Sequence, residues 1–389
     1  MKSSHKNYLS TYVLAFLGIV LMIKVIVAPK STVSWVDKSD IKSADSIVCW
    51  YTGAENRAFF EKCADDFEKE TGIAVTVKEQ SSLNYFSEIY EAVKAEGEAP
   101  DVYLLEADGL EQAYYCQLTE ENQCKDMYKE GWAENAIEAS RCEGNMYGYP
   151  LYFNTGMFAY RTDYFETAPA TIQEMIDYSV EHEPGEGVEK LLEWNLSDGF
   201  YNFPFFGAAI QWQEEEMGTI GWTCEEETYE ACRTFFGNLT AAIELDEDTI
   251  SSTSVVEDFK NGKTVAVFLD SDDMTELCEE CCQIAGLPNL NEELPMVPVA
   301  KTTLLCVNAM SEKKDAAGEF ATYVSREEIG KLTELTGHIP VCENALSTKE
   351  EKLAYAQYEE AVLEPDALNA TDFWVKFQNE VLKIWNAEE

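Results

Sequence analysis

The sequence predicts an α/β fold organised as two lobes. The chain has 389 residues, more than a single hydrophobic core ordinarily accommodates. Hydrophobic residues make up 46% of it and include 19 Phe, 20 Tyr and 8 Trp, enough for a well-packed interior. Residues 45–105 also alternate between strand-like and helix-like patterns, as the start of a mainly parallel sheet does.

The N-terminal elements follow from local periodicity. Apolar residues recur at helical spacing in 55–70, and Gly72 is placed to end that helix. Residues 73–77 alternate in the manner of a strand. The expected order is strand 45–51, helix 55–70, strand 73–77, helix 85–95 and strand 101–105.

The remaining elements are expected from the same patterns. Residues 181–260 are rich in helix formers and aromatic residues, so we expect them to be mostly helical. Pro365 breaks the long helical pattern at the C-terminus. The other expected elements are helix 163–179, strands 264–269, 283–288 and 304–308, and helices 316–324 and 349–385.

The formal net charge of −45 limits the classes of partner. A surface this acidic repels nucleic-acid phosphates and anionic lipid headgroups, so we expect no binding to nucleic acid. Two interpretations of the acidity stay open. Either the acidic side chains keep the exterior solvated, or some of them line a cleft for a cationic ligand such as a polyamine.

The first 28 residues have the composition of an export signal or a membrane anchor, with a basic start and an apolar run over 12–28. No cysteine precedes Cys49, which argues against lipoprotein anchoring, and Pro29 directly follows the only small residue suited to cleavage. We therefore favour an uncleaved anchor, followed by a polar tether at 29–44. The folded part is expected on the extracellular face of the membrane, or secreted if the leader is cleaved.

Twelve cysteines in an exported chain raise the question of disulfides. Two pairs are close enough in sequence for local bridges, Cys116 with Cys124 and Cys224 with Cys232. The run at 278–282 holds three cysteines that a helix would place on one face. Packed thiols, a disulfide or a metal site would each fit that run, although no histidine lies nearby to strengthen a zinc signal. No metal or other cofactor is expected.

A series of seven short segments resembles a known family when taken in order. The segments are Phe67–Val77, Ala99–Leu105, Tyr147–Leu151, Met157–Phe165, Phe259–Phe268, Lys314–Phe320 and Gly337–Val341. Together they resemble the extracellular solute-binding proteins of ABC importers, in the sugar-binding, maltose-binding-protein-like branch, over residues 45–385. The resemblance implies a two-lobed periplasmic-binding-protein-like (type II) fold with a hinge and an interlobe cleft. It also implies a monomer whose partner is the membrane permease of the importer.

The same resemblance implies that the chain passes between the lobes more than once. Lobe one is expected to hold residues 45–152 plus 270–308, and lobe two residues 153–269 plus 309–389. The crossings would then fall near 150–154, Asp270 and Asn308.

The candidate binding residues lie where strands and crossings open onto the expected cleft. In an open α/β sheet, ligands meet the carboxyl ends of the strands. The expected ligand-binding residues are Trp50, Tyr51, Glu55, Asp108, Tyr152, Asn154, Phe203, Phe205, Trp212 and Asp270. Several have a structural alternative, because the aromatic residues also suit a core and Asp108 could cap the following helix.

A mono- or oligosaccharide is the ligand that these residue types suit best. Aromatic rings cover the flat faces of a sugar ring, and carboxylates or amides accept its hydroxyl hydrogen bonds. A polyamine receptor, a non-transport sensor or scaffold, and a carbohydrate-cleaving enzyme are the alternatives. We do not expect an enzyme, because the chain has three histidines and no hydrolase, protease or phosphate-binding motif.

Overall fold

The computed structural model describes residues 46–95, 99–182, 185–214, 220–245, 251–277, 282–365 and 370–387. The expected leader at 1–28 and tether at 29–44 lie outside the described residues. Within the described residues, none of the helices has both the length and the apolar character needed to cross a membrane.

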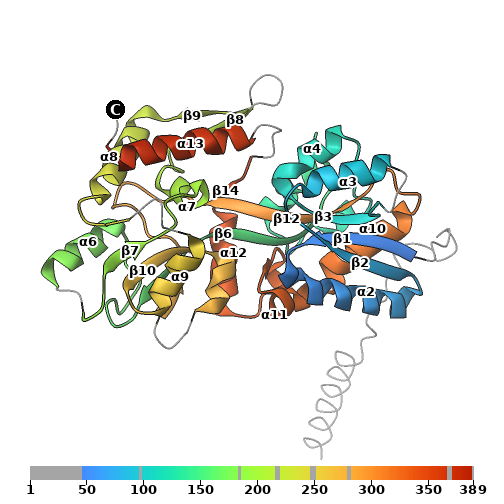
Figure 1. Cartoon of the computed structure of the whole chain (residues 1–389), viewed down its shortest axis with the longest axis horizontal. Helices are drawn as coiled ribbons and strands as arrows, with labels where there is room; N and C mark the ends of the chain where they lie inside the picture. The colour runs from blue at the N-terminus through green and yellow to red at the C-terminus, as the bar shows by residue number, and fades with distance from the viewer. Residues whose placement is uncertain are drawn as a thin grey trace, which may run out of the picture. The chain divides into compact units, whose positions relative to one another are not determined.

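A ten-stranded sheet forms the centre of the fold (Figure 1). Seven of its strands follow one path in the order β2-β1-β3-β12-β6-β10-β7, and β11, β13 and β14 pair beside that path. The strands are β1 (Ser46–Thr52), β2 (Ala74–Gln80), β3 (Val102–Glu106), β6 (Tyr149–Arg161), β7 (Lys190–Glu193), β10 (Thr264–Asp270), β11 (Cys282–Ala285), β12 (Val299–Val307), β13 (Ile339–Pro340) and β14 (Val362–Leu363).

The sheet is mixed, whereas the sequence predicted a mainly parallel one. β1 runs parallel to β2 and to β3, as the alternation of strands and helices indicated. Antiparallel pairing then joins β3 to β12, β12 to β6 and β6 to β10. The expectation fails there because β6, β10 and β12 come from distant parts of the chain, where no repeated strand–helix unit sets their direction.

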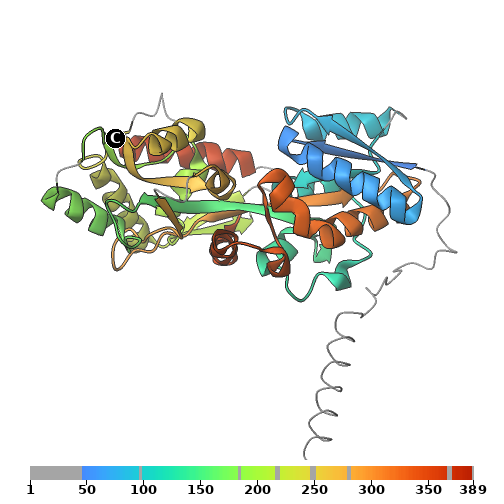
Figure 2. The ribbon, with the colours of Figure 1, turned by 90° about the horizontal axis from the view of Figure 1, so that it is seen from below.

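Strand β6 connects the two groups of elements, as Figure 2 shows along its length. It is 13 residues long, and residues 149–155 pair with β12 while 156–160 pair with β10. The partner changes between Thr155 and Gly156. One continuous strand therefore carries the chain from one group of helices to the other.

The first group packs around β1, β2 and β3. Its helices are α2 (Arg57–Thr71), α3 (Tyr85–Lys94), α4 (Leu110–Tyr115), α5 (Glu134–Ala139), α10 (Lys314–Thr322) and α11 (Leu332–Thr336), with a small hairpin of β4 (Arg141–Cys142) and β5 (Asn145–Met146). Helix α2 buries Phe59, Phe60, Cys63 and Phe67 at helical spacing and ends at Gly72 in the left-handed conformation (φ 81°), as expected.

The second group packs around β7 and β10. Its helices are α6 (Ile172–Glu181), α7 (Gly199–Asn202), α8 (Glu226–Leu239), α9 (Ser252–Lys260), α12 (Lys349–Glu359) and α13 (Ala370–Trp385), with the hairpin of β8 (Ile210–Glu214) and β9 (Ile220–Cys224). The expected helix 163–179 begins only at Ile172, where Thr171 caps it. The expectation of a mostly helical 181–260 is wrong in part, because β7 and the hairpin lie there. Their short apolar runs and the two tryptophans of the hairpin suit strands as well as helices.

The packing departs from the expected lobe boundaries in two places. Ala316 and Phe320 of α10 share a buried cluster with Ile47 of β1 and Phe60 of α2, although 309–389 was assigned to lobe two. Strand β11 pairs with residues 158–161 of β6, although 270–308 was assigned to lobe one.

The two short cysteine pairs are not bridged, because Cys116, Cys124, Cys224 and Cys232 are all free thiols. Residues 278–281 of the cysteine run lie outside the described residues, and Cys282 belongs to a strand.

Candidate functional site

Four adjacent strands carry polar residues on one face of the sheet. The strand register pairs Glu106 with Thr303, Thr303 with Tyr152, and Lys301 with Asn154. Asp270 pairs with Gly156, two residues beyond Asn154. Directly opposed residues share a face, as do residues two apart in a strand. Glu106, Tyr152, Asn154, Asp270, Lys301 and Thr303 therefore lie on one side, here called the polar face.

Asn154 connects the polar face to the turn that follows β10. Its Nδ2 donates to Asp270 Oδ1 at 2.8 Å and to Asp272 Oδ2 at 2.7 Å. The backbone N–H of Asp272 also donates to Asp270 Oδ1, at 2.9 Å, so that Asp270 caps the 3₁₀ turn Ser271–Glu276. Two carboxylates are thus held together by one amide and one backbone donor.

A second set of contacts extends from Asp272 to the end of β1. His338 Nδ1 lies 2.7 Å from Asp272 Oδ2, and the His338 ring stacks on Tyr152 with centroids 4.0 Å apart. Asn56 Nδ2 donates to the Tyr152 hydroxyl at 3.3 Å. Glu55 Oε1 lies 3.9 Å from His338 Nε2. These contacts bring together residues far apart in sequence, from the turn after β1, from β6, from the turn after β10 and from the loop before β13.

Lys301 pairs with Asn154 in the strand register and has several carboxylates around it. Its Nζ is 4.0 Å from Glu364 Oε1 and 5.1 Å from the centroid of the Phe200 ring. Burial lowers the pKa of Lys301, but the charges of Glu364, Glu106, Asp198 and Asp270 raise it by more. Lys301 is therefore a charged ammonium group that partly balances the acidic side chains around it.

The side chains of Glu106 and Asp108 combine solvent exposure with desolvation. Both are exposed to solvent. Desolvation by surrounding protein nevertheless raises the pKa of each carboxyl. The two observations agree if the side chains line a cleft, where solvent reaches them but protein fills most of the space around them.

Asp270 and Glu364 have the largest pKa shifts among the carboxyls of this region. Burial, and then the negative charge of Asp272, raises the pKa of Asp270 to about 7. Burial also raises the pKa of Glu364 to about 7, although Lys301 opposes the shift. Groups with strongly perturbed pKa values in a cleft are common at functional sites.

Trp50 and Tyr51 lie in cores, although both were expected to bind ligand. Trp50 is 8% exposed in a cluster with Tyr85 and Leu105. Tyr51 is 2% exposed, and its ring stacks on Phe60 with centroids 5.0 Å apart. Consecutive residues of a strand point to opposite faces, and both faces of β1 are covered, so neither ring is free to stack on a solute.

The predicted aromatic segment at 203–212 lies in the other core. Phe203 and Phe205 are fully buried. Phe203 stacks on half-buried Trp212 with centroids 5.2 Å apart, and Phe205 packs on Trp194 and Phe236. Lys301 Nζ lies over the Phe200 ring. Burial, and then the negative charge of Asp270, raises the pKa of Tyr201. The aromatic ring that lies against Lys301 of the polar face thus comes just before the segment expected from sequence.

The structure therefore brings together five of the ten predicted residues: Glu55, Asp108, Tyr152, Asn154 and Asp270. It adds Glu106, Asp272, Lys301, His338 and Glu364, which were not among the predicted set. Two features of the sequence could have identified some of these added residues. Asp272 is two residues beyond Asp270, and Lys301 would have been noticed had the strand expected at 304–308 been extended to Val299.

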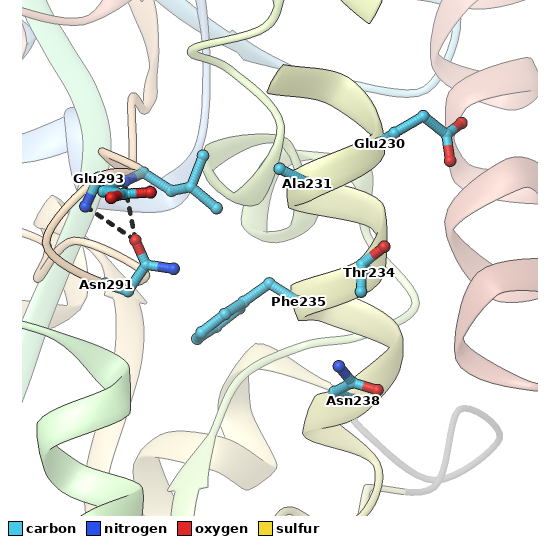
Figure 3. A pocket seen from close by; sticks show the side chains of 8 residues that line it. Glu230, Ala231, Thr234, Phe235, Asn238, Asn291 and Glu293 are labelled. Carbon is cyan, nitrogen blue, oxygen red and sulfur yellow. Dashed lines mark hydrogen bonds between the residues drawn. The ribbon is translucent and has the colours of Figure 1, made fainter. Parts of the chain in front are cut away.

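A separate pocket of about 520 Å³ lies in the second group (Figure 3). It lies between α8 and the loop at 291–294, with Phe235 and Leu294 supplying apolar surface. None of the ten predicted residues lines it. Its eight lining residues include two glutamates and no Lys, Arg or His, so we place the functional site at the polar face instead.

Comparison with known proteins decides the family. Residues 62–361, well over half of the chain, match the model of the family described as bacterial extracellular solute-binding protein. The chain belongs to that family. The sequence-based recognition of a solute-binding protein is thereby confirmed.

Solved structures confirm the fold of this solute-binding protein. A cyclo/maltodextrin-binding protein complexed with maltotetraose superposes with a TM-score of 0.77 at 18% identity, covering 89% of this chain and 93% of that one. An extracellular solute-binding protein from Staphylococcus aureus in complex with maltose gives 0.76 at 17%, covering 88% and 93%. A maltose-binding periplasmic protein from Listeria monocytogenes, also with maltose, gives 0.74 at 18%, covering 89% and 94%. The two-lobed, periplasmic-binding-protein-like α/β fold is therefore confirmed.

Proposed function

We propose that this solute-binding protein is the receptor of an ABC importer and captures a mono- or oligosaccharide between its two lobes. The observation that carries the proposal is the polar face, where β6 passes from one group of elements to the other and the carboxylates of Glu106 and Asp270 share one face of the sheet. The maltose and maltodextrin complexes of proteins with the same fold support a sugar as the solute.

The chemistry of the polar face suits a polyhydroxylated solute. Carboxylates accept hydrogen bonds from sugar hydroxyls, and each such bond to a charged group contributes roughly 1.5–3 kcal/mol. The rings of Tyr152, Phe200 and Tyr201 near this face are buried, so the proposal relies on hydrogen bonds and not on stacking of aromatic rings. A few such contacts are enough for the roughly −8 kcal/mol of a micromolar complex after entropic costs.

The proposed binding residues combine the sequence-based set with those found from the structure. They are Glu55, Glu106, Asp108, Tyr152, Asn154, Asp270, Lys301 and Glu364. Lobe one in this proposal holds the first group of elements, and lobe two holds the second group. Hinge bending at the strands between them would close the cleft over the solute.

The remaining parts of the proposal concern the cellular setting. Proteins of this family bind solutes, and we propose that this one binds without catalysis. We also propose that the N-terminal segment anchors it on the outer face of the cell membrane, where the closed form docks on a permease as a monomer.

Thermal unfolding of the full chain against sugars tests the proposal. A sugar present at 100 times its Kd should stabilise the protein by about 2.7 kcal/mol, a readily measured rise in the midpoint. The Asn154→Ala variant should lose the shift, because Asn154 holds Asp270 and Asp272 in place. An exposed control, Glu61→Gln in α2, should retain it. If no sugar shifts the midpoint, the sugar-receptor proposal fails.

A further inference from the structure

The pocket between α8 and the loop at 291–294 has two walls that the fold holds in place (Figure 3). Helix α8 buries another of its faces in the core of the second group. The loop is closed by a hydrogen bond from the backbone N–H of Leu290 to the carbonyl oxygen of Leu294, at 2.8 Å. Backbone N–H groups at the start of α6 donate to the carbonyl oxygens of Asn289 and Leu290. Walls fixed in this way lose little conformational entropy when a ligand binds.

Asn291 presents an amide nitrogen to the pocket. Its Oδ1 accepts hydrogen bonds from the backbone N–H groups of Glu293, at 2.9 Å, and Leu294, at 3.0 Å. These two donors identify the oxygen of the amide, so Nδ2 is the group left to bind a ligand. In Figure 3 this nitrogen is directed toward α8. No acceptor for Nδ2 is found among the described residues.

A row of polar side chains follows the pocket along α8. Glu230, Thr234 and Asn238 come at intervals of four residues and therefore share one face of the helix. Thr234 and Asn238 are exposed, and neither side chain has a hydrogen-bond partner among the described residues. They offer a ligand one hydroxyl and one amide, each of which can both donate and accept.

Phe235 supplies an accessible aromatic ring between these polar groups. Its side chain is half-buried and packs against the core cluster of the second group, so part of it remains open to the pocket. In Figure 3 the ring extends from α8 toward Asn291. An aromatic ring flanked by hydroxyl and amide groups suits a sugar, whose rings have apolar faces and hydroxyl edges.

The charge of the pocket favours a neutral ligand. An anion would meet two glutamates and no Lys, Arg or His in the lining. Glu230 is paired with Arg233, whose Nη1 lies 3.5 Å from Glu230 Oε2. Glu293 is exposed, and an exposed carboxylate attracts a cation only weakly through water and salt.

We propose that this pocket is a second carbohydrate site, which holds a neutral mono- or disaccharide with one face against Phe235 and its hydroxyls on Asn291 and Asn238. The volume of about 520 Å³ lies within the roughly 300–1,000 Å³ of small-molecule sites. The inference does not rest on the proposed receptor function, because none of the residues of the polar face lines this pocket. Solvent competes for the exposed polar groups, so we expect millimolar affinity.

Saturation-transfer NMR of the full chain with millimolar sugars tests the inference. The neutral probes are glucose, galactose and maltose, and glucosamine and glucuronic acid are the charged analogues of glucose. The measurements use the Asn154→Ala variant, so that the polar face does not contribute. We expect transfer to a neutral sugar, with an affinity about tenfold or more above that for glucuronic acid. Tighter binding of glucosamine than of glucose overturns the neutral ligand class, and no transfer to any neutral sugar overturns the site.

A matched pair of variants in the loop tests the role of Asn291. Asn291→Asp keeps the oxygen that accepts from the loop backbone but removes the Nδ2 donor, and we expect it to weaken binding by about fivefold. Asn289→Asp adds the same charge on an exposed side chain that does not line the pocket, so its affinity should match that of the unaltered loop. An equal loss in the two variants overturns the role of the Asn291 amide.

A second pair of variants tests the aromatic ring. Phe235→Leu keeps apolar packing against the core but removes the ring, and should weaken binding by about fivefold. Phe235→Tyr keeps the ring face and should bind as the native residue does. Equal affinities of Leu and Tyr at this position overturn the stacking.

The unaltered chain separates this site from the proposed receptor site. With Asn154 intact, Phe235→Leu should leave binding at the polar face unchanged. If Asn154→Ala abolishes all sugar binding, the second site is overturned and the receptor proposal stands. If the only sugar binding of the unaltered chain is lost in Phe235→Leu, the second site stands and the receptor proposal is overturned.

Discussion

The side chains of Asp270 and Glu364 differ from ordinary surface carboxylates. Both have a pKa of about 7, mainly because burial disfavours the ionised form. A carboxyl whose pKa is higher in the folded than in the unfolded state binds more protons when folded. Its contribution to the free energy of unfolding then decreases as the pH rises from about 4 to about 7. At neutral pH the free protein keeps these groups at a cost in stability.

Asp270→Asn should remove that cost without removing the hydrogen bonds. The amide oxygen can still accept from the backbone of Asp272. We expect the free energy of unfolding at pH 7.5 to rise by about 1–2 kcal/mol, after allowing for partial solvent exposure. The gain should shrink toward pH 4.5, where Asp270 is protonated. Urea unfolding across that pH range measures it, with the exposed Asp65→Asn as control, and a loss of stability at pH 7.5 would contradict the burial argument.

Gly53 and Gly72 allow backbone strain to be separated from an effect on the site. Both have positive φ, 83° and 81°, so alanine at either position should cost about 1 kcal/mol. A Cβ at Gly53 would displace the Glu55 carboxylate, whereas a Cβ at Gly72 meets nothing within 4 Å. We expect Gly53→Ala to weaken solute binding and Gly72→Ala to leave it unchanged, as measured by calorimetry. Equal affinities in the two variants would count against a role for Glu55.

At the scale of elements, the aromatic segment from α7 to the hairpin shows how one element can serve two purposes. Phe203 and Phe205 of the 3₁₀ turn after α7 point into the core around Trp194 and Phe377. Phe200 and Tyr201, one turn earlier, belong to the same buried cluster, and the Phe200 ring also lies 5.1 Å from Lys301 Nζ. The sequence shows a run of aromatic residues, and the turn of the chain determines which of them also reach Lys301 on the polar face.

Phe205→Ala should therefore lower stability rather than affinity. Its ring is fully buried and packs against Trp194, Phe236 and Phe268. Truncation leaves a cavity and should cost about 3–5 kcal/mol in the free energy of unfolding. Under conditions where the variant remains folded, its affinity for the solute should match that of the native protein. A selective loss of binding at unchanged stability would indicate that Phe205 contacts the solute.

The capping box of α12 gives a prediction of its own. Thr348 accepts a hydrogen bond from the backbone of Glu351, and the Glu351 side chain accepts from the backbone of Thr348. Thr348→Ala should reduce the free energy of unfolding by about 1 kcal/mol. Chemical denaturation measures the change. Thr348→Ser should restore most of it, and a Ser variant as unstable as the Ala variant would show that the cap is not the cause.

At the scale of the whole molecule, β6 and β12 are the strands that the two groups of elements share. β6 pairs with β12 in its first half and with β10 in its second half. The polar face lies where these partners change, so a bend there would move one group relative to the other across the proposed site. This arrangement is the structural basis for the proposed hinge.

Small-angle scattering should detect closure of the proposed hinge. We expect the radius of gyration of the full chain to decrease when the bound solute is added, because the lobes would then enclose it. The Asn154→Ala variant at the same solute concentration is the control for a direct effect of the solute on scattering. An unchanged radius of gyration at a concentration that saturates binding would contradict hinge closure.

The local elements of the first group could be predicted from sequence with small errors. Helix 55–70 is observed as Arg57–Thr71, helix 85–95 as Tyr85–Lys94, and strand 101–105 as Val102–Glu106. The signals there are apolar periodicity and a glycine stop, which act within a few residues. The strands within 181–260 were not predicted, because short apolar runs and aromatic residues support both strands and helices until their packing partners are known.

Local sequence patterns were enough to predict the family, the α/β class and half of the candidate site. Asp270 and Asn154 could be predicted because each lies within a strand. The contact between Asp272 and His338, 66 residues apart, and the position of Lys301 opposite Asn154 follow from tertiary packing. Strand register and chain reversal set those contacts. They depend on how whole elements pack, and no local pattern of residues encodes them.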